Sequence, residues 1–416
     1  MSETTTSLEQ QTPLERQYGE LQAKNLTLDL TRGKPSPAQL DLSNALLGLP
    51  GEGDYRDASG TDLRNYGGAD GLPELRAIFS ELLQIPADQL LAYGNASLAI
   101  MHDTIVQALL VGVPGGTGPW RDVPDVAVLC PVPGYDRHFT ILESLGVRMI
   151  PVPFVDGRLD LDTIRSLVAA DPAIRGMWCV PMYSNPTGVT YTIDEVEALV
   201  GMETAAPDFR LFWDNAYAVH HLTDDEPLPL DVLGMAERAG HPDRPLVYAS
   251  TAKITFPGAG VAFFGASRTN VEWMRARTSA QTIGPDKLNQ LRHLRFFGDA
   301  EGVRRLMRQH RDIIAPRFAA VERILSARLT GVATWTHPTG GYFVSLEVPR
   351  GTASLAVALA GAAGVALTPA GSAFPYRDDP NDSNIRIAPT FPTIDDLEAA
   401  IDALCTSVLL AVERSN

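Results

Sequence analysis

The chain has 416 residues, of which 45% are hydrophobic and 20% charged, a balance typical of a globular protein with a sizeable core. Its formal net charge of -16 argues against broad contact with a nucleic-acid backbone, because such contact needs clustered lysine and arginine. The longest apolar run, near residues 355–367, is short and broken by glycines, and residues 1–9 lack the pattern of a signal peptide. We therefore expect a cytoplasmic protein without nucleic-acid or membrane partners.

The cysteines and histidines predict neither a disulfide framework nor a metal site. Cys130, Cys179 and Cys405 lie far apart and lack the close spacing of zinc ligands. The adjacent His220 and His221 have no third ligand nearby in the sequence, so we expect them to be structural.

The N-terminal segment is expected to contribute little to the core. Residues 1–25 are polar with a weak helical pattern, which suggests an arm rather than a core element. Residues 26–30 alternate apolar with polar side chains like a short half-buried strand, and a turn through Gly33 and Pro35 follows. We expect residues 1–50 to form an N-terminal arm and part of a small domain.

Two loops that run into helices carry candidate binding residues. Residues 65–76 are glycine-rich, and Tyr66, the one aromatic there, is by default a packing residue. Ala96 and Ser97 precede a second helix, where small residues leave backbone N–H groups free to bind an anion such as phosphate. This signal is common at helix N-termini and is weak when taken alone.

The middle of the chain alternates short apolar runs with helical segments, which predicts a mostly parallel sheet covered by helices on both faces. The runs are residues 126–130, 147–152, 177–181, 211–213, 246–249 and 261–264. Polar residues follow four of them, at 131–138, 184–188, 214–217 and 250–253. Because ligands of such sheets bind beyond the carboxyl ends of the strands, we expect these residues to converge on one crevice.

Lys253 is the most informative single residue, because no other charge follows it until Arg268. Apolar surroundings disfavour the charged ammonium, so its pKa should fall and the free amine should become a nucleophile toward a carbonyl group. A surface lysine on a turn is the alternative for this residue considered by itself.

The C-terminal third predicts a smaller α+β unit. Residues 299–329 show an amphipathic, arginine-rich pattern of one or two long helices that could lead out of the sheet. Three strand-like runs follow, at 340–346, 365–369 and 384–388. We expect a large domain over residues 51–305 and a small C-terminal domain over residues 306–416.

Taken in order, four motifs resemble those of the pyridoxal-phosphate-dependent aminotransferases of fold type I, class I/II, and more narrowly the divergent bacterial aspartate aminotransferase subgroup. The motifs are Asn185-Pro186-Thr187-Gly188, Asp214 with Tyr217, Ser250 with Lys253, and Arg386. The resemblance covers nearly the whole chain. It implies an α/β fold with a mostly parallel seven-stranded sheet in the large domain and a smaller α+β domain.

The resemblance also implies roles for the candidate catalytic residues. Lys253 would bind the cofactor covalently and later move the proton of the substrate's α-carbon, and Asp214 would pair with the pyridine nitrogen. Tyr217 and Asn185 would hydrogen-bond the ring's 3′-oxygen. Considered one at a time, these last three residues could instead be an end-of-strand turn aspartate, a packing tyrosine and a turn asparagine.

Further cofactor contacts are implied by the same resemblance. Tyr135 would stack on the ring, and His138 would orient Asp214. The phosphate would lie against Ala96, Ser97 and Ser250. Tyr66 would reach it from a second subunit, which implies a homodimer with shared active sites.

Substrate binding is implied for Arg386, whose planar guanidinium can pair with an α-carboxylate, with Gly33 and Asn185 beside it. The chain departs from the family at two points. No arginine stands at residues 260–263, where many members bind the phosphate. The residue that binds a distal carboxylate is not fixed either, and Arg137, Lys287 and Arg292 are candidates.

The predicted function is transfer of an amino group between an amino acid, aspartate or glutamate, and a 2-oxo acid, 2-oxoglutarate or oxaloacetate, by a ping-pong mechanism. A transaminase of different or broader donor range and a β-lyase on the same fold are alternatives. A regulatory ligand sensor is a third, but the short acidic N-terminal segment does not resemble a DNA-binding domain.

Overall fold

The computed structural model describes residues 12–415 and is built around one eight-stranded sheet, whose strand order is β2-β9-β8-β7-β6-β3-β4-β5. The strands are β2 (Leu90–Ala92), β3 (Ala127–Val132), β4 (Arg148–Val155), β5 (Arg158–Leu159), β6 (Ile174–Cys179), β7 (Arg210–Asp214), β8 (Pro245–Ser250) and β9 (Ala262–Ala266). All six expected runs form strands. The five central strands from β4 to β8 run parallel, and β9 is antiparallel to its neighbours. The two-residue β5 pairs antiparallel with β4, forms one edge of the sheet and brings the expected seven strands to eight.

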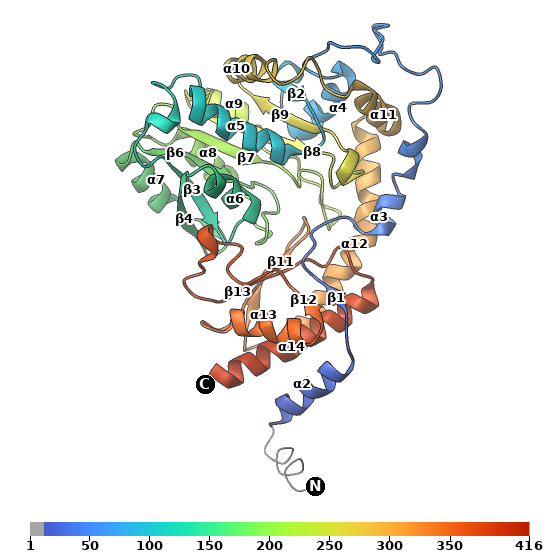
Figure 1. Ribbon diagram of the computed structural model, residues 1–416, viewed down its shortest axis with the longest axis vertical. Coiled ribbons are helices and arrows are strands. Elements are labelled where there is room, and N and C mark those ends of the chain that lie inside the picture. The colour runs from blue at the N-terminus through green and yellow to red at the C-terminus, as the bar shows by residue number, and fades with distance from the viewer. Residues whose placement is uncertain (1–11, 416) are drawn as a thin grey trace.

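Helices cover both faces of this sheet (Figure 1). They are α4 (Pro73–Leu83), α5 (Ser97–Val111), α6 (Asp136–Ser144), α7 (Leu161–Ala170), α8 (Ile193–Gly201), α9 (Val232–Arg238), α10 (Arg268–Thr278) and α11 (Lys287–Phe297). Successive strand side chains point to opposite faces, so Val128 and Cys130 pack with α5, α6 and α10, while Ala127 and Leu129 join the core on the other face. Both faces are therefore buried, as parallel strands require.

A single 30-residue helix, α12 (Ala300–Leu329), leads from the sheet to the C-terminal region (Figure 1). Its first turns place Val303 and Met307 in the core beside the sheet, and its later turns place Val321 and Leu325 in a second core. The helix continues through Pro316. Of the two alternatives left open by the sequence, one long helix is correct.

The second core belongs to a smaller unit of mixed composition. Its three-stranded antiparallel sheet has the order β10 (Thr334–Trp335), β11 (Val344–Glu347), β13 (Asn384–Ile387), and a parallel pair joins β1 (Leu28–Asp29) to β12 (Val365–Ala366). Helices α13 (Ala353–Ala362) and α14 (Ile394–Ser415) pack against these strands. The expected domain boundaries at residues 50 and 305 stay a prediction.

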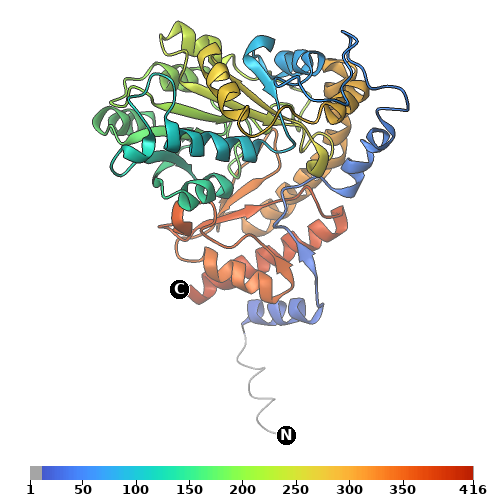
Figure 2. The same ribbon diagram turned by 45° about the horizontal axis from the view of Figure 1, so that its top comes forward.

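The N-terminal helix α2 (Pro13–Ala23) packs against α14 in the views of Figures 1 and 2. Tyr18 and Leu21 are buried in the second core, and the Tyr18 hydroxyl donates a hydrogen bond to the Leu359 carbonyl at 2.7 Å. The prediction of an arm outside the core is wrong for this helix, because its apolar residues pack on residues far along the chain, as Tyr18 does on Leu359, 341 residues away. Residues 1–11 lie outside the described part of the structure.

Two further observations concern chemistry that the sequence excluded. Within residues 12–415 the three cysteines are buried and unpaired, and no three histidine, cysteine, aspartate or glutamate side chains are grouped to hold a metal ion. No helix in the same range is long and apolar enough to cross a bilayer.

Candidate active site

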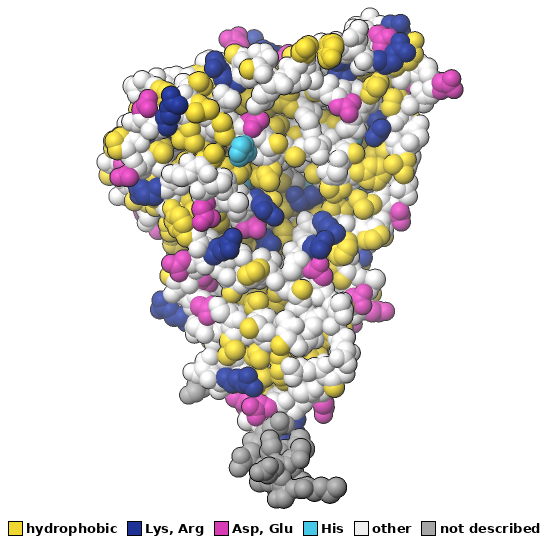
Figure 3. All heavy atoms as spheres, viewed as in Figure 1, with side chains coloured by type: hydrophobic (Ala, Val, Ile, Leu, Met, Phe, Trp, Pro, Cys, Tyr) yellow, Lys and Arg dark blue, Asp and Glu magenta, His cyan; other side chains and the backbone are white. Residues whose placement is uncertain are grey.

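A cavity of about 220 Å³ lies where the carboxyl ends of the central strands face the C-terminal unit. Nine of the expected site residues line it: Gly33, Ser97, Tyr135, Arg137, Asn185, Asp214, Tyr217, Lys253 and Arg386. Basic and acidic side chains stand close together in the middle of the face seen in Figure 3.

The sheet explains this convergence. Asp214 is the last residue of β7, and Ser250 is the last residue of the neighbouring parallel strand β8. Tyr135 follows β3 and directly precedes α6, while Asn185 lies in the loop after β6. Residues far apart in the chain therefore meet at one edge of the sheet.

Asp214 is the most deeply fixed acid of the cavity. Its Oδ2 lies 2.9 Å from Nε2 of His138, and both side chains are almost fully buried. His138 itself stacks on Trp178, with ring centres 4.2 Å apart. The other carboxylate oxygen, Oδ1, is buried and has no hydrogen-bond partner among residues 12–415. A buried acceptor without a donor is rare, and here it suits the N–H of a ligand.

Lys253 lies close to this carboxylate in a segment of small and apolar residues. Burial lowers the pKa of Lys253, and the nearby Asp214 partly opposes this effect. The Lys253 Nζ atom is 4.8 Å from the centre of the Tyr217 ring. The direction of this shift agrees with the expectation from the sequence, because burial disfavours the charged ammonium.

Tyr217 and Asn185 complete the wall beside the lysine, and both are buried. Burial raises the pKa of Tyr217 well above its usual value, with further contributions from Tyr135 and Asp214. Tyr217 therefore remains a hydroxyl donor at any physiological pH. Asn185 Oδ1 faces Nη1 of Arg386 at 3.5 Å.

Arg386, on β13, brings a guanidinium from the C-terminal unit into the cavity. Its Nη2 donates to Thr368 Oγ1 at 2.9 Å, and its carbon Cζ lies 5.0 Å from the Phe343 ring centre. Gly33 packs against that same ring, where a Cβ atom would lie 2.0 Å from Phe343 Cζ. Glycine at position 33 is thus required by Phe343, whereas the sequence suggested only an approach to a carboxylate.

Of the expected phosphate-binding residues, Ser97 lines the cavity, Ala96 lines a neighbouring one, and Ser250 lines neither. Ala96 is the N-cap of α5 and has no side chain that could cap the helix, so the first N–H groups of this 15-residue helix lack a side-chain cap. Ser97 opens the helix, and half-buried Ser250 ends β8. Gly260 is the first of the four positions where an arginine would be expected, and its backbone carbonyl accepts a hydrogen bond from Asn289.

Tyr66 does not reach this cavity, and its side chain is 80% exposed. Its loop is held by Lys287, whose Nζ donates to the carbonyls of Asn65 at 2.9 Å and Gly67 at 2.6 Å. Exposure of a large aromatic residue on a fixed loop agrees with a role toward a second chain, which stays a prediction.

Among the three candidates for a distal carboxylate, only Arg137 lines the cavity. Lys287 is engaged by the backbone of the Tyr66 loop, and Arg292 Nε donates to the Leu49 carbonyl at 2.9 Å. The exposed side chain of Arg137 makes no hydrogen bond or ion pair with any residue between 12 and 415.

Sequence reasoning missed a buried polar network behind Lys253. His310 on α12 accepts a hydrogen bond at Nδ1 from the Gln39 amide at 2.9 Å and donates from Nε2 to the Ile254 carbonyl at 3.0 Å. The same amide donates to the Tyr342 hydroxyl at 3.1 Å, which in turn lies 3.4 Å from the Lys253 carbonyl. The network thus holds the turn that carries Lys253 from two sides. Single histidines and glutamines at wide spacing carry no signal in one sequence.

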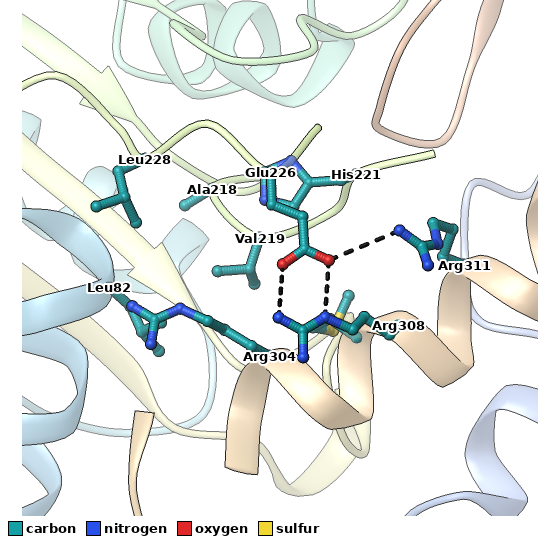
Figure 4. A pocket seen from close by; sticks show the side chains of 10 residues that line it. Leu82, Ala218, Val219, His221, Glu226, Leu228, Arg304, Arg308 and Arg311 are labelled. Carbon is teal, nitrogen blue, oxygen red and sulfur yellow. Dashed lines mark hydrogen bonds and ion pairs between the residues drawn. The ribbon is translucent and has the colours of Figure 1, made fainter. Parts of the chain in front are cut away.

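The loop after Tyr217 is fixed by ion pairs outside the cavity (Figure 4). Glu226 accepts two hydrogen bonds from Arg308, each 2.9 Å long, and its Oε1 lies 3.6 Å from Nη1 of Arg311. The hollow beside them holds about 20 Å³, room for a water molecule only. The charges there hold the loop against α12.

Comparison with known proteins gives a consistent result. The family model described as aspartate amino-transferase matches residues 1–416. A Mycolicibacterium smegmatis protein named as an aminotransferase is 61% identical over 405 residues, covering 96% of this chain and 95% of its own. An aspartate aminotransferase of Corynebacterium glutamicum is 51% identical, covering 96% of this chain and 92% of its own.

Solved structures agree. A Corynebacterium glutamicum aspartate transaminase superposes with a TM-score of 0.95 at 51% identity, covering 97% of this chain and 95% of that one. An α-aminoadipate aminotransferase of Thermus thermophilus, complexed with N-(5′-phosphopyridoxyl)-L-leucine, has a TM-score of 0.73 at 19% identity, covering 97% and 96%. The second likeness concerns the fold alone.

Proposed function

Because this chain belongs to the aspartate aminotransferase family and is an aminotransferase, we propose that its cavity binds pyridoxal 5′-phosphate and serves amino-group transfer between aspartate or glutamate and a 2-oxo acid. One observation carries the proposal: the unpartnered Oδ1 of Asp214 and the amine of Lys253 face the same cavity. An acceptor for a ring N–H and a nucleophile for an aldehyde are the two groups that this cofactor requires, so the residues present fit it.

When bound, the cofactor supplies an aldehyde for the substrate's amino group and a ring that withdraws electrons from the α-carbon. Asp214 would accept the pyridinium N–H at Oδ1 while His138 holds Oδ2, which keeps the carboxylate in place. Lys253 would attach through Nζ and, once the substrate's amine has replaced it, take the proton from the substrate's α-carbon. Tyr217 and Asn185 would hydrogen-bond the 3′-oxygen, and Tyr135 would cover the ring.

Phosphate binding is proposed for the uncapped N-terminus of α5, at Ala96 and Ser97, together with the Ser250 hydroxyl. Tyr66 of a second copy would complete this end of the site, so we propose a homodimer with shared sites. A cytoplasmic location remains part of the proposal.

Substrate binding is proposed for the opposite end. Arg386 would pair with the α-carboxylate beside Asn185, and Gly33 lets its segment lie close enough to border this carboxylate. Arg137 would bind the distal carboxylate, since the other two candidate cations are already engaged by backbone carbonyls.

The test compares wild-type protein with Lys253→Ala. We expect a yellow wild-type protein that converts aspartate and 2-oxoglutarate to oxaloacetate and glutamate, and a variant without turnover or covalently bound cofactor. Lys24→Ala, at an exposed helix end, is the matched control and should behave as wild type. Fast transfer from other donors with little from aspartate, or release of pyruvate and ammonia from a β-substituted amino acid, would favour the alternative functions instead.

A further inference from the structure

An acid of the cavity has no role in the function proposed above. Asp136 is the first residue of α6, and its Oδ1 lies 3.5 Å from Nη1 of Arg386. Both residues line the cavity, and the Asp136 side chain is 31% exposed against 11% for Arg386. The carboxylate of Asp136 therefore faces the guanidinium that is proposed to receive the substrate's carboxylate.

The contact between them is loose for an arginine and a carboxylate. Charge-assisted N–H···O bonds are usually 2.7–2.9 Å long, and good pairs are bidentate. Here Nη1 shares two contacts of 3.5 Å, to Asp136 and Asn185, and buried Nε has no partner among residues 12–415. Arg386 retains capacity for a better-fitting carboxylate, so Asp136 neutralises it without saturating it.

The acidic and basic residues that line the cavity also indicate that Asp136 acts on Arg386. The lining of the cavity carries three basic side chains, Arg137, Lys253 and Arg386, and two acidic ones, Asp136 and Asp214. Asp214 is paired with His138, so Asp136 is the one acid of the lining that is placed to oppose an incoming anion at Arg386. A second carboxylate on this guanidinium would repel Asp136 across a short distance inside the protein.

We propose that Asp136 determines anion affinity at the substrate site, by competing with the substrate's carboxylate for Arg386 and keeping small anions off it. The proposal rests on the assignment of Arg386 to the α-carboxylate. The competition belongs to Arg386 rather than to any one ligand, so it weakens every carboxylate that binds there by a similar factor. Removal of the Asp136 charge should tighten binding, which is the opposite of what removal of a binding residue does.

The test uses two unreactive ligands that carry no amino group, succinate and propionate, with binding measured by calorimetry on the cofactor-loaded protein and on the apoprotein. Asp136→Asn keeps the side-chain shape and should tighten both ligands by about tenfold, the factor expected when one close like charge is removed. Sulfate should also inhibit this variant at lower concentration than it inhibits wild type.

Glu143→Gln is the matched control, because it removes the same charge from an exposed position on the same helix, and it should leave binding unchanged. Unchanged binding in Asp136→Asn, with only a lower melting temperature, would mean that Asp136 merely stabilises the start of α6 and would overturn the proposal. Weaker binding of both ligands would also overturn it.

A third variant separates this proposal from the function on which it rests. Arg386→Gln should abolish binding of both ligands. If it does not, the assignment of Arg386 is wrong, and there is no substrate carboxylate at Arg386 with which Asp136 could compete. If it does, while Asp136→Asn binds no more tightly than wild type, the proposed function stands and the role of Asp136 alone is refuted.

Discussion

At the scale of single residues, the pairing of Asp214 with His138 determines which carboxylate oxygen is free to accept a hydrogen bond from a ligand. One carboxylate oxygen is held at 2.9 Å by a buried imidazole, and the other is left for a ligand. The stacking of His138 on Trp178 fixes the imidazole in turn. The carboxylate of Asp214 is therefore held in one orientation by buried protein groups rather than by solvent.

Replacement of His138 by phenylalanine keeps an aromatic ring over Trp178 and removes only the hydrogen bond. Such a bond to a charged group is worth about 1.5–3 kcal/mol, so turnover should fall by about 10- to 100-fold. Steady-state kinetics with aspartate and 2-oxoglutarate provide the measurement. His337→Asn, at an exposed position of the C-terminal unit, should turn over normally, and normal turnover in His138→Phe would show that Asp214 needs no orientation.

At the scale of elements, the segment that carries Gly33 is connected to the turn that carries Lys253. The connection runs through α3 (Pro37–Asp41), α12 and the loop before β11. The connection is Gln39, whose amide donates to both His310 and Tyr342. Burial lowers the pKa of His310 to about 4, so the ring is neutral at working pH and accepts the Gln39 hydrogen bond at Nδ1.

Gln39→Leu should destabilise the protein by about 1–3 kcal/mol, because it leaves a buried imidazole nitrogen and a buried hydroxyl without their donor. Urea unfolding would measure the loss in the apoprotein. Gln22→Leu, on the exposed side of α2, should change stability by no more than about 0.5 kcal/mol. Equal effects of the two substitutions would mean that the network adds nothing to stability.

The ion pair between the Tyr217 loop and α12 predicts a dependence on pH. The hydrogen bond from Arg308 lowers the pKa of Glu226 in the folded protein, although burial opposes it. A depressed carboxyl pKa contributes stability above the unfolded value and loses it as pH falls through the folded value.

Glu226→Gln should therefore lower the melting temperature at pH 7, by an amount that corresponds to at most about 1 kcal/mol for a pair so near the surface. The difference from wild type should vanish in acid, below the folded pKa of Glu226. Calorimetry at several pH values tests this, and a difference that persists at the acid end would contradict it.

At the scale of the whole molecule, the exposed Tyr66 bears on the proposed homodimer. If each site takes Lys253 from one chain and Tyr66 from the other, then a mixed dimer of Lys253→Ala and Tyr66→Ala chains contains one site with both native residues. Mixing equal amounts of the two impaired variants, after dissociation and reassociation, should restore about a quarter of native activity, because about half of the dimers are mixed and each mixed dimer has one native site of two. Activity no greater than the mean of the separate variants would contradict shared sites.

Most of the fold, and the convergence of most candidate site residues on one cavity, could be predicted because both depend on local patterns. Apolar runs of three to six residues predicted the strands, and the polar segments directly after them, which include Asp214 and Lys253, were predicted to meet at one edge of the sheet. What could not be predicted depends on distant partners. Helix α2 appeared to be an arm because Tyr18 and Leu21 pack on residues far along the chain, and Lys287 remained a candidate until its contacts with two backbone carbonyls were known.

The interleaving of the two chain ends has a consequence for synthesis on the ribosome. Strand β1 pairs with β12, and α2 packs on α14, which ends at Ser415. The sheet strands from β2 to β9 are all translated before any of these partners exists. The apolar side of α2 therefore stays uncovered until α14 has been translated, after every strand of the large sheet.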